Sequence, residues 1–151
     1  MSRLIALVAL ALTFQAHAFC FQDAGRRYHI DPLLLRSIAM QESGLNPHAI
    51  NQNRNRKGAV TSTDYGLMQI NSVHVPELKR LGIIHSSREL LDNACLNVEV
   101  GAWILAKAFQ VCDVNWRCLG AYNAGFKKDN PNRLKYARRV FTIYRKLKGM
   151  P

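Results

Sequence analysis

The sequence has few acidic residues, and this shortage is the first constraint on what the protein binds. Its 151 residues include 10 Asp and Glu against 21 Lys and Arg, which gives a formal net charge of +11. A chain this basic is attracted to polyanions. Many of the cations fall in the C-terminal stretch, where a solvated helix face is the simplest interpretation: Arg133, Lys135, Arg138, Arg139, Arg145, Lys146 and Lys148.

The sequence also lacks internal repeats, low-complexity tracts and long linkers of Pro, Gly or Ser. Its length suits one domain with a continuous core, and nothing in it requires a second. After the N-terminal segment, no stretch approaches the roughly 20 apolar residues that a membrane-spanning helix needs. We therefore expect one domain and no transmembrane segment.

The N-terminus has the pattern of an export signal. Arg3 precedes an apolar run from Leu4 to Leu12, and the triplet Ala16-His17-Ala18 fits a signal-peptidase site. We therefore expect a signal peptide over residues 1–18, a domain over residues 19–151 and a periplasmic product. Export removes most nucleic acid from reach, so no nucleic-acid partner is expected. Lipid attachment at Cys20 is disfavoured, because Phe19 is bulky where a small residue is normal.

Metal-binding patterns are missing as well. The sequence has no CxxC pair and no His at ligand spacing, so no metal site is expected. The four cysteines instead favour two disulfides, because an even number in an exported chain is typical of disulfide bonding. Three connectivities are possible. Pairing of Cys112 with Cys118 closes a short loop and is favoured, which leaves Cys20 to pair with Cys95.

The first half of the chain combines one clear helix with polar and β-favouring segments. Asp31-Pro32 is an N-cap residue followed by proline at the first helical position, and apolar residues recur on one face after it. This pattern predicts a helix over Pro32–Ser43. The polar, charged residues 51–58 predict a loop. The β-favouring residues within 59–71 predict a small hairpin or strand pair.

Helices are expected to dominate the second half of the chain. Short ones are predicted over residues 76–81 and 87–92, and a long one over residues 93–111, whose apolar spacing suits the buried centre of the domain. Two more are expected over residues 115–122 and 133–148, the last with an apolar stripe. The predicted fold class is therefore α+β, predominantly helical, with one small sheet.

Glu42 is the candidate catalytic residue. It lies one turn after Ile38, on the apolar face of its predicted helix. Partial burial raises the pKa of a carboxyl group and lets it keep a proton near neutral pH, as a general acid must. From position alone, a surface charge is the more common explanation. However, the helix dipole disfavours an anion at a C-terminal end, so helix stability does not explain Glu42.

Three motifs follow one another along the chain, namely Glu42 to Ala49 (ESGLNPHA), Gly66 to Asn71 (GLMQIN) and Ala121 to Gly125 (AYNAG). In this order they resemble the soluble lytic transglycosylases, and the resemblance covers the chain from about residue 20 to residue 147. It is closest to the small, exported, single-domain members associated with type III secretion systems, conjugation machinery and type IV pili. Further residues match the same family, namely Asn97, Gly101 and Tyr136.

The resemblance implies a lysozyme-like fold with a small β-hairpin and cleavage of peptidoglycan glycan strands. The bond cleaved would be the β-1,4 bond between N-acetylmuramic acid and N-acetylglucosamine. Glu42 would protonate the leaving oxygen, then take a proton from the muramoyl C6 hydroxyl as that hydroxyl attacks C1. An anhydro sugar results, no water is consumed and no cofactor is implied. The implied partners are glycan strands and an envelope-spanning secretion or pilus machine.

The family match also implies substrate-binding residues, each with a structural alternative. Ser43 could bind substrate or order Glu42, or it could simply cap its helix. Asn71 could bind sugar or cap the helix that follows. Met68 resembles a subsite wall but could pack in the core. Tyr136 could pack in the core, or it could place its hydroxyl near the catalytic carboxylate, and the sequence favours the two roles equally. The remaining residues expected to bind sugar are Gln69, Tyr122 and Asn123.

The run Ser62 to Gly66 (STDYG) departs from the family, whose ordinary members have small apolar or neutral residues there. It resembles the strand of animal c-type lysozymes that bears their second catalytic carboxylate. Asp64 could therefore stabilise an oxocarbenium-like transition state, or act as a nucleophile if it lies about 5 to 5.5 Å from Glu42. The alternative is a turn residue that binds backbone amides. A hydrolytic muramidase therefore remains a competing hypothesis. A non-catalytic peptidoglycan-binding scaffold, whose basic face would bind the wall or a partner protein, is a further one.

Overall fold

The structure, a computed structural model, describes residues 20–125 and 130–150, and the signal peptide expected over residues 1–18 lies outside them. A helical segment over residues 20–28 comes first. The elements that follow are α2 (Pro32–Ser43), β1 (Ile50–Arg54), β2 (Val60–Tyr65), β3 (Ile70–Asn71), the 3₁₀ helix η1 (Ser72–His74), α3 (Val75–Arg80), α4 (Glu89–Asp92), α5 (Ala94–Cys112), α6 (Trp116–Leu119), α7 (Ala121–Ala124) and α8 (Pro131–Leu147).

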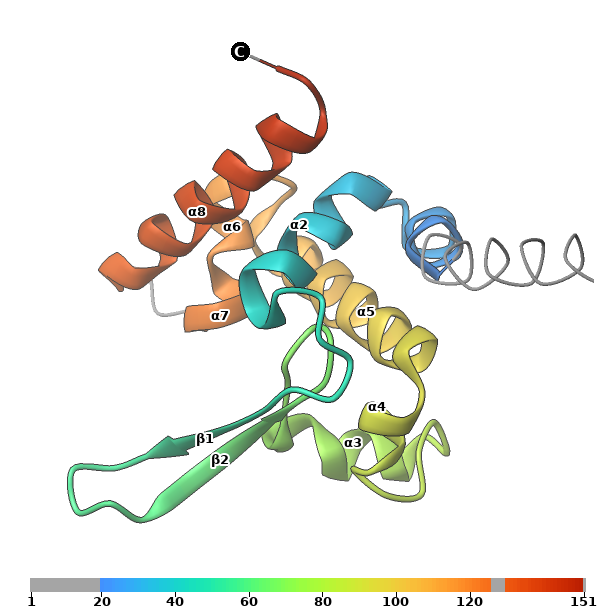
Figure 1. The fold of residues 1–151 in the computed structure, drawn as a ribbon, viewed down its shortest axis with the longest axis vertical. Coiled ribbons are helices and arrows are strands. Elements are labelled where there is room, and N and C mark those ends of the chain that lie inside the picture. Colours follow the sequence, from blue (N-terminus) through green and yellow to red (C-terminus); the bar gives the residue numbers. More distant parts are fainter. Residues whose placement is uncertain (1–19, 126–129, 151) are drawn as a thin grey trace, which may run out of the picture.

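Two groups of elements lie on either side of α5 (Figure 1). Helices α2, α6, α7 and α8 pack together in one group, and α2 and α8 lie against each other. The hairpin of β1 and β2, with α3 and α4, forms the other group. The expected α+β class, predominantly helical, is confirmed.

Helix α2 begins and ends where the sequence predicts. Asp31 caps its start, because its Oδ1 accepts a hydrogen bond from the Leu33 N–H at 2.8 Å. At the other end, Gly44 adopts the left-handed conformation with φ 63°, and its N–H donates to the Met40 carbonyl at 3.1 Å. This cap turns the chain away immediately after Glu42, which is left in the last turn of the helix.

Helix α5 is the buried centre of the fold, as its apolar spacing predicts. Its buried residues include Val98, Gly101, Leu105 and Ala108. By length and composition alone, its 19 residues with a mean hydropathy of 1.2 could cross a membrane, so the expectation of no such stretch was too strict. The buried central helix of a globular domain can have the same composition, and α5 is such a helix in this fold.

The sheet is larger than the sequence predicts. Its strands are antiparallel in the order β1-β2-β3, and Asp64 of β2 lies opposite Asn51 of β1 and Asn71 of β3. The prediction of a loop over residues 51–58 is wrong, because residues 50–54 form β1. Strand β1 is polar and almost entirely exposed, so it lacks the alternation of apolar residues that marks a half-buried strand. Pairing with β2 holds it in place.

The single helix predicted over residues 115–122 is two helices, α6 and α7, which break at Gly120. A Cβ on Gly120 would lie 2.3 Å from the Arg133 carbonyl oxygen, so only glycine permits this close approach of α8.

Two disulfides brace the helices. Cys20 is bonded to Cys95, which joins the first helical segment to the start of α5, and Cys112 is bonded to Cys118 between α5 and α6. This is the pairing that the short-loop argument favours. The two disulfides close loops of very different length: Cys20 and Cys95 are separated by 75 residues in the sequence, and Cys112 and Cys118 by 6.

Candidate active site

Glu42 lies where the end of α2 meets α8. The Tyr136 hydroxyl on α8 donates a 2.6 Å hydrogen bond to Glu42 Oε1. Tyr136 is only 1% exposed, and burial raises its pKa well above the ordinary value, so the hydroxyl remains a donor. One oxygen of the carboxyl group is therefore held in a fixed position by a buried side chain.

Burial raises the pKa of Glu42 from 4.5 to about 7. The hydrogen bond from Tyr136 opposes this shift, the negative charge of Asp64 adds to it, and the positive charge of Arg139 reduces it. A carboxyl group with this pKa is present in both protonation states near neutral pH. It can therefore donate a proton and later accept one.

Asp64 is held by amide side chains from both neighbouring strands. Asn53 Nδ2 on β1 donates to Asp64 Oδ2 at 2.8 Å, and Asn71 Nδ2 on β3 donates to Asp64 Oδ1 at 2.7 Å. Both carboxylate oxygens are thus fixed across the sheet. Both contacts come from amide side chains on paired strands. The alternative for Asp64, a turn residue that binds backbone amides, predicts different partners.

Ser43 ties the end of α2 to the turn between β2 and β3. Its hydroxyl donates to the Leu67 carbonyl at 2.7 Å and to the Ala39 carbonyl at 3.2 Å. The first contact crosses from the helix that carries Glu42 to the turn that follows the strand of Asp64. These contacts fit both the ordering role and the helix-capping role considered for Ser43.

Asn97 holds the same turn from the side of α5. Fully buried, it accepts from the Met68 N–H at 2.7 Å and donates to the carbonyls of Tyr65 at 2.8 Å and Leu90 at 2.9 Å. A Cβ on Gly66 would lie 2.4 Å from Asn97 Nδ2, and Gly66 has φ 73°, so the turn requires glycine. The buried amide thus anchors the strand end that carries Asp64.

A cleft brings these groups together. One cavity of about 270 Å³ is lined by carboxylate, amide and hydroxyl side chains, which suit the hydroxyl and N-acetyl groups of sugars: Glu42, Asn53, Ser62, Asp64, Gln69, Asn71, Tyr122 and Asn123. A second cavity of about 480 Å³ shares part of this lining, namely Ser62, Asn71, Tyr122 and Asn123. The two cavities therefore adjoin each other along these four residues.

Comparison with known families identifies the protein class. The model of the family described as "Transglycosylase SLT domain" matches residues 19–141. The chain belongs to the transglycosylase SLT domain family. It is therefore a peptidoglycan lytic transglycosylase. Because peptidoglycan lies outside the cytoplasm, this SLT domain acts there.

Relatives of similar length share almost half of their residues with the SLT domain. A "Peptidoglycan-binding-like protein" of Escherichia coli O157:H7 is 45% identical over 144 residues, which cover 95% of this chain and 86% of the relative. "Invasion protein IagB" of Salmonella typhimurium is 44% identical over 136 residues, covering 89% and 81%. An "X polypeptide" of Escherichia coli is 45% identical over 135 residues, covering 87% and 76%.

The fold of the SLT domain is also found in a much larger protein. The X-ray structure of an inactive mutant of the lytic transglycosylase Slt from Pseudomonas aeruginosa superimposes with a TM-score of 0.62 at 20% sequence identity. The match covers 90% of this chain and 25% of the Slt chain, so the SLT domain spans about a quarter of that protein's length. This similarity confirms the expected fold.

The cleft of the SLT domain gathers most of the residues expected from sequence. Glu42 and Asp64 line it together with the expected sugar-binding residues Gln69, Asn71, Tyr122 and Asn123. Asn71 has a second role, because its Oδ1 accepts from the Val73 N–H at 3.0 Å and caps η1. Gln69 is held in the left-handed region at φ 49°, with its Nε2 donating to the Gly66 carbonyl at 2.8 Å.

Two of the expected substrate contacts lie in the interior. The prediction of a subsite wall at Met68 is wrong, because its side chain is fully buried and packs against Gly101, where a Cβ would lie 2.9 Å from it. Its backbone still matters, since the Met68 carbonyl accepts from the Tyr122 hydroxyl at 3.0 Å. Tyr136 is likewise buried, and its hydroxyl contacts Glu42.

Sequence reasoning missed three residues near the reaction centre. Asn53 was overlooked because β1 was taken as a loop. Ser62 lies in the predicted hairpin, and its spacing of two from Asp64 marks one face of a strand, but this signal was not used. Ser62 Oγ accepts from Asn53 Nδ2 at 3.0 Å and from Asn71 Nδ2 at 3.1 Å, which completes the network below Asp64. Arg139 was assigned only to a solvated face, yet its charge acts on Glu42.

Proposed function

We propose that the protein cleaves the β-1,4 bond between N-acetylmuramic acid and N-acetylglucosamine with Glu42 as both acid and base. One observation carries this proposal: a carboxyl group with a pKa of about 7, held by Tyr136, lies in a polar groove. Because the pKa is close to neutral, one group can serve both proton transfers.

Protonated Glu42 donates its proton to the glycosidic oxygen, and the bond from that oxygen to C1 of the muramoyl residue breaks. N-acetylglucosamine leaves with a free 4-hydroxyl, and positive charge develops at C1. The Glu42 carboxylate then takes the proton of the C6 hydroxyl while the C6 oxygen bonds to C1. The products are a 1,6-anhydro sugar and a regenerated acid, so no water is consumed.

Asp64 stabilises the positive charge that develops at C1. Its carboxylate is fixed by Asn53 and Asn71 before substrate arrives, so little reorganisation is needed during the reaction. The amide and hydroxyl groups of the cleft bind the sugar rings on either side of the cleaved bond: Ser62, Gln69, Asn71 and Asn123.

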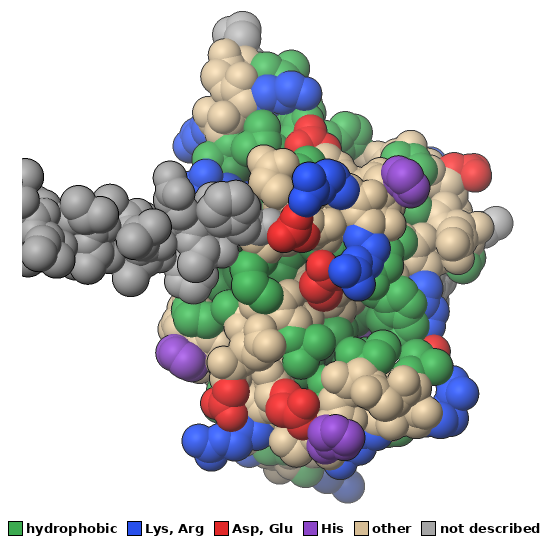
Figure 2. Space-filling view, turned by 90° about the vertical axis from the view of Figure 1, so that its right-hand side faces the viewer, with side chains coloured by type: hydrophobic (Ala, Val, Ile, Leu, Met, Phe, Trp, Pro, Cys, Tyr) green, Lys and Arg blue, Asp and Glu red, His purple; other side chains and the backbone are tan. Residues whose placement is uncertain are grey.

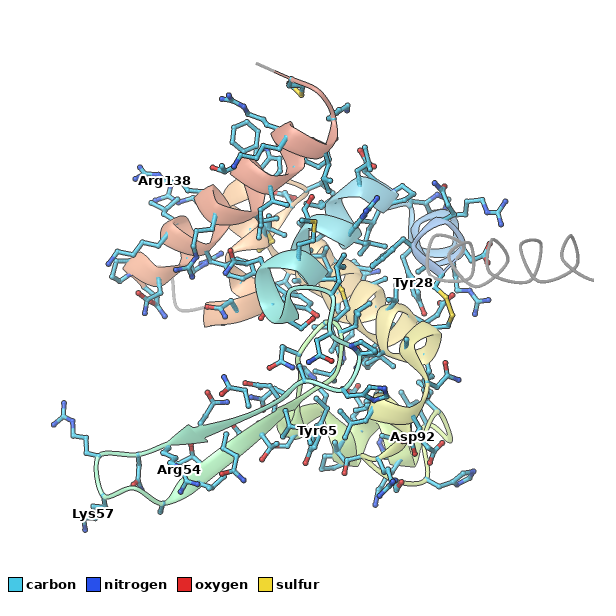
Figure 3. All side chains as sticks on the ribbon, viewed as in Figure 1. Tyr28, Arg54, Lys57, Tyr65, Asp92 and Arg138 are labelled. Carbon is cyan, nitrogen blue, oxygen red and sulfur yellow. A yellow bond between two sulfur atoms is a disulfide. The ribbon has the colours of Figure 1, made fainter. Side chains whose placement is uncertain are left out.

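Mass spectrometry of digested peptidoglycan tests the reaction. Wild-type protein should release anhydromuropeptides, and the Glu42→Gln variant should release none. Asp64→Asn should slow their release by about 100-fold, the effect typical of removing one preorganised charge-stabilising group. Matched controls are Glu89→Gln and Asp92→Asn on α4, which remove the same charges from residues that do not line the cleft and should leave the rate unchanged. Figure 3 shows Asp92 on the side of the molecule near α4.

Other products would favour other functions. Reducing-end muropeptides without anhydro sugars would make the protein a hydrolytic muramidase in which Asp64 acts as in a lysozyme. Binding of peptidoglycan without any soluble product would make it a scaffold protein. Either result would contradict the proposed mechanism.

The biological setting we propose is local opening of the wall during assembly of an envelope-spanning secretion, conjugation or pilus machine. Support comes from the relative named "Invasion protein IagB", with which 89% of this chain aligns. Deletion of the gene should reduce assembly of such a machine. Complementation with wild type, but not with Glu42→Gln, should restore it. Restoration by the inactive variant would separate the protein's cellular role from wall cleavage.

A further inference from the structure

The outer side of α8 carries apolar and basic side chains that the active site does not use. Leu134, Arg138, Phe141 and Arg145 follow one another at spacings of three and four residues, so they share one side of the helix. With about 3.6 residues per turn, this side is opposite Tyr136, which faces α2 and Glu42. Leu134 is 43% exposed and Phe141 36% exposed, so both large apolar groups meet solvent.

Trp116 on α6 extends the same surface. Its ring packs edge-on against Phe141 with 4.7 Å between centroids, and it remains 39% exposed. The disulfide between Cys112 and Cys118 closes the loop that carries Trp116 and Val114, and Val114 is 80% exposed. We define the aromatic-basic face as Trp116, Leu134, Arg138, Phe141 and Arg145, together with Val114 because it lies in the same short disulfide loop as Trp116.

The part of this face that α8 contributes has a strongly one-sided charge. Residues 130–150 contain no Asp or Glu, although Lys and Arg recur throughout them. The Arg145 guanidinium lies 5.9 Å from the centroid of the Phe141 ring, so cationic and aromatic groups are interleaved. Elsewhere the surface is mixed: Figure 2 shows acidic and basic side chains interspersed on another side of the molecule. The aromatic-basic face therefore differs from a generally basic surface.

We propose that the aromatic-basic face binds an anionic lipid surface, so that the enzyme acts on the wall from a membrane. Tryptophan and other large apolar groups insert at the boundary between headgroups and acyl chains, while arginine gains from the negative surface potential. A water-soluble polyanion such as nucleic acid would match the arginines but leave Val114, Leu134 and Phe141 in water. Because Tyr136 and the carboxyl group of Glu42 that it contacts lie on the opposite side of α8, lipid binding leaves Glu42 outside the contact.

Vesicle sedimentation tests the proposal. The purified protein should pellet with phosphatidylcholine vesicles that contain phosphatidylglycerol and should remain in solution with phosphatidylcholine alone. The double variant Arg138→Gln with Arg145→Gln should weaken partitioning by about five-fold for each arginine removed. At about 0.15 M salt, charges more than about 8 Å from the membrane contribute little to binding. A loss of binding therefore shows that the replaced arginine lies close to the membrane.

A matched control removes the same charge elsewhere. Arg56 and Lys57 are exposed at the tip of the hairpin, and Figure 3 shows Lys57 at that tip and Arg138 on the outer side of α8. Arg56→Gln with Lys57→Gln should bind vesicles as wild type does. Equal loss in both double variants would show a general charge effect and overturn the proposal.

Fluorescence gives a second readout of the same face. The chain has two tryptophans, so Trp103→Phe leaves Trp116 as the only tryptophan, and its emission can be excited selectively at the red edge of tryptophan absorption, where tyrosine absorbs little. Its emission should shift to the blue with anionic vesicles, and Phe141→Ser in that background should abolish the shift. Unchanged Trp116 emission would overturn the proposal. The proposal would also be overturned if the protein bound soluble polyglutamate, lost that binding when the two arginines were replaced, and did not bind vesicles. That result would indicate an acidic protein partner.

Discussion

Tyr136 and Glu42, which are 94 residues apart in the sequence, are joined by a 2.6 Å hydrogen bond from the tyrosine hydroxyl to Glu42 Oε1. The contact exists because α8 packs on α2 with Tyr136 on its inner side. Burial raises the pKa of Glu42, and the hydrogen bond counteracts part of this rise by stabilising the ionised carboxylate. The pKa of the proposed catalytic acid is therefore set by the packing of two helices.

Tyr136→Phe should move the pH profile of peptidoglycan cleavage to higher pH. Loss of the donor removes stabilisation of the carboxylate, so the pKa of Glu42 should rise by about one unit more. The cleavage rate should fall by about ten-fold at neutral pH, since the carboxyl group is also no longer held. Rates of release of soluble fragments across pH measure both effects.

Tyr144→Phe is the matched control for that variant. The Tyr144 hydroxyl also donates to a carboxylate next to α2, Asp31 Oδ2 at 2.6 Å, but away from the cleft. Its removal should leave the pH profile unchanged. A profile that moves equally in both variants would contradict the role assigned to Tyr136.

Glu42→Gln should stabilise the protein at alkaline pH. In the folded state the carboxyl group keeps its proton up to about pH 7, whereas in the unfolded chain it loses the proton near its ordinary pKa of 4.5. The folded state therefore binds more protons between these values, and the free energy of unfolding of the wild type falls as pH rises through this window. Glutamine has no proton to lose.

The two proteins should therefore have similar stability near pH 4. Near pH 8 the variant should be more stable by on the order of 3 kcal/mol, at about 1.4 kcal/mol for each unit of pKa shift. Urea denaturation at both pH values measures the difference. If the variant and the wild type were equally stable near pH 8, burial of the ionised Glu42 side chain would not destabilise the folded protein.

Asn53→Ala should slow cleavage without unfolding the protein. The variant removes one of the two amide donors that hold Asp64, so its Oδ2 is no longer fixed. A hydrogen bond to a charged group is worth about 1.5 kcal/mol or more, which corresponds to a loss of about ten-fold in rate. Gln52→Ala, on the same exposed strand but facing the other way, is the control and should be as active as wild type. Equal activity of both variants would remove Asn53 from the site.

Asn97→Ala should be strongly destabilising. The change leaves the Met68 N–H and the carbonyls of Tyr65 and Leu90 buried without their partner, at a combined cost of about 3 to 5 kcal/mol. The exposed cap Asn93 on the same helix is the control, and Asn93→Ala should cost about 1 kcal/mol. Chemical denaturation measures both values. Similar costs in the two variants would show that the amide of Asn97 does not anchor the turn.

Sequence reasoning worked where a residue's position follows from its neighbours along the chain. The N-cap at Asp31 and the glycine after Ser43 predict the bounds of α2, and apolar spacing predicts the burial of α5. It failed at β1, because a strand that is exposed on both faces has no apolar alternation to show. It failed again at Met68, since a side chain in a sugar-binding motif can still point into the core.

The sequence by itself determined the family, singled out Glu42 and Asp64 as the candidate carboxylates and favoured two disulfides among its four cysteines. These depend on residue types in a fixed order, which the chain carries whatever its shape. Only the tertiary structure decided the environment of each group. The pKa of Glu42, the amides around Asp64 and the aromatic-basic face all require elements distant in the sequence to pack together, because desolvation, hydrogen bonds and exposure are properties of the packed chain.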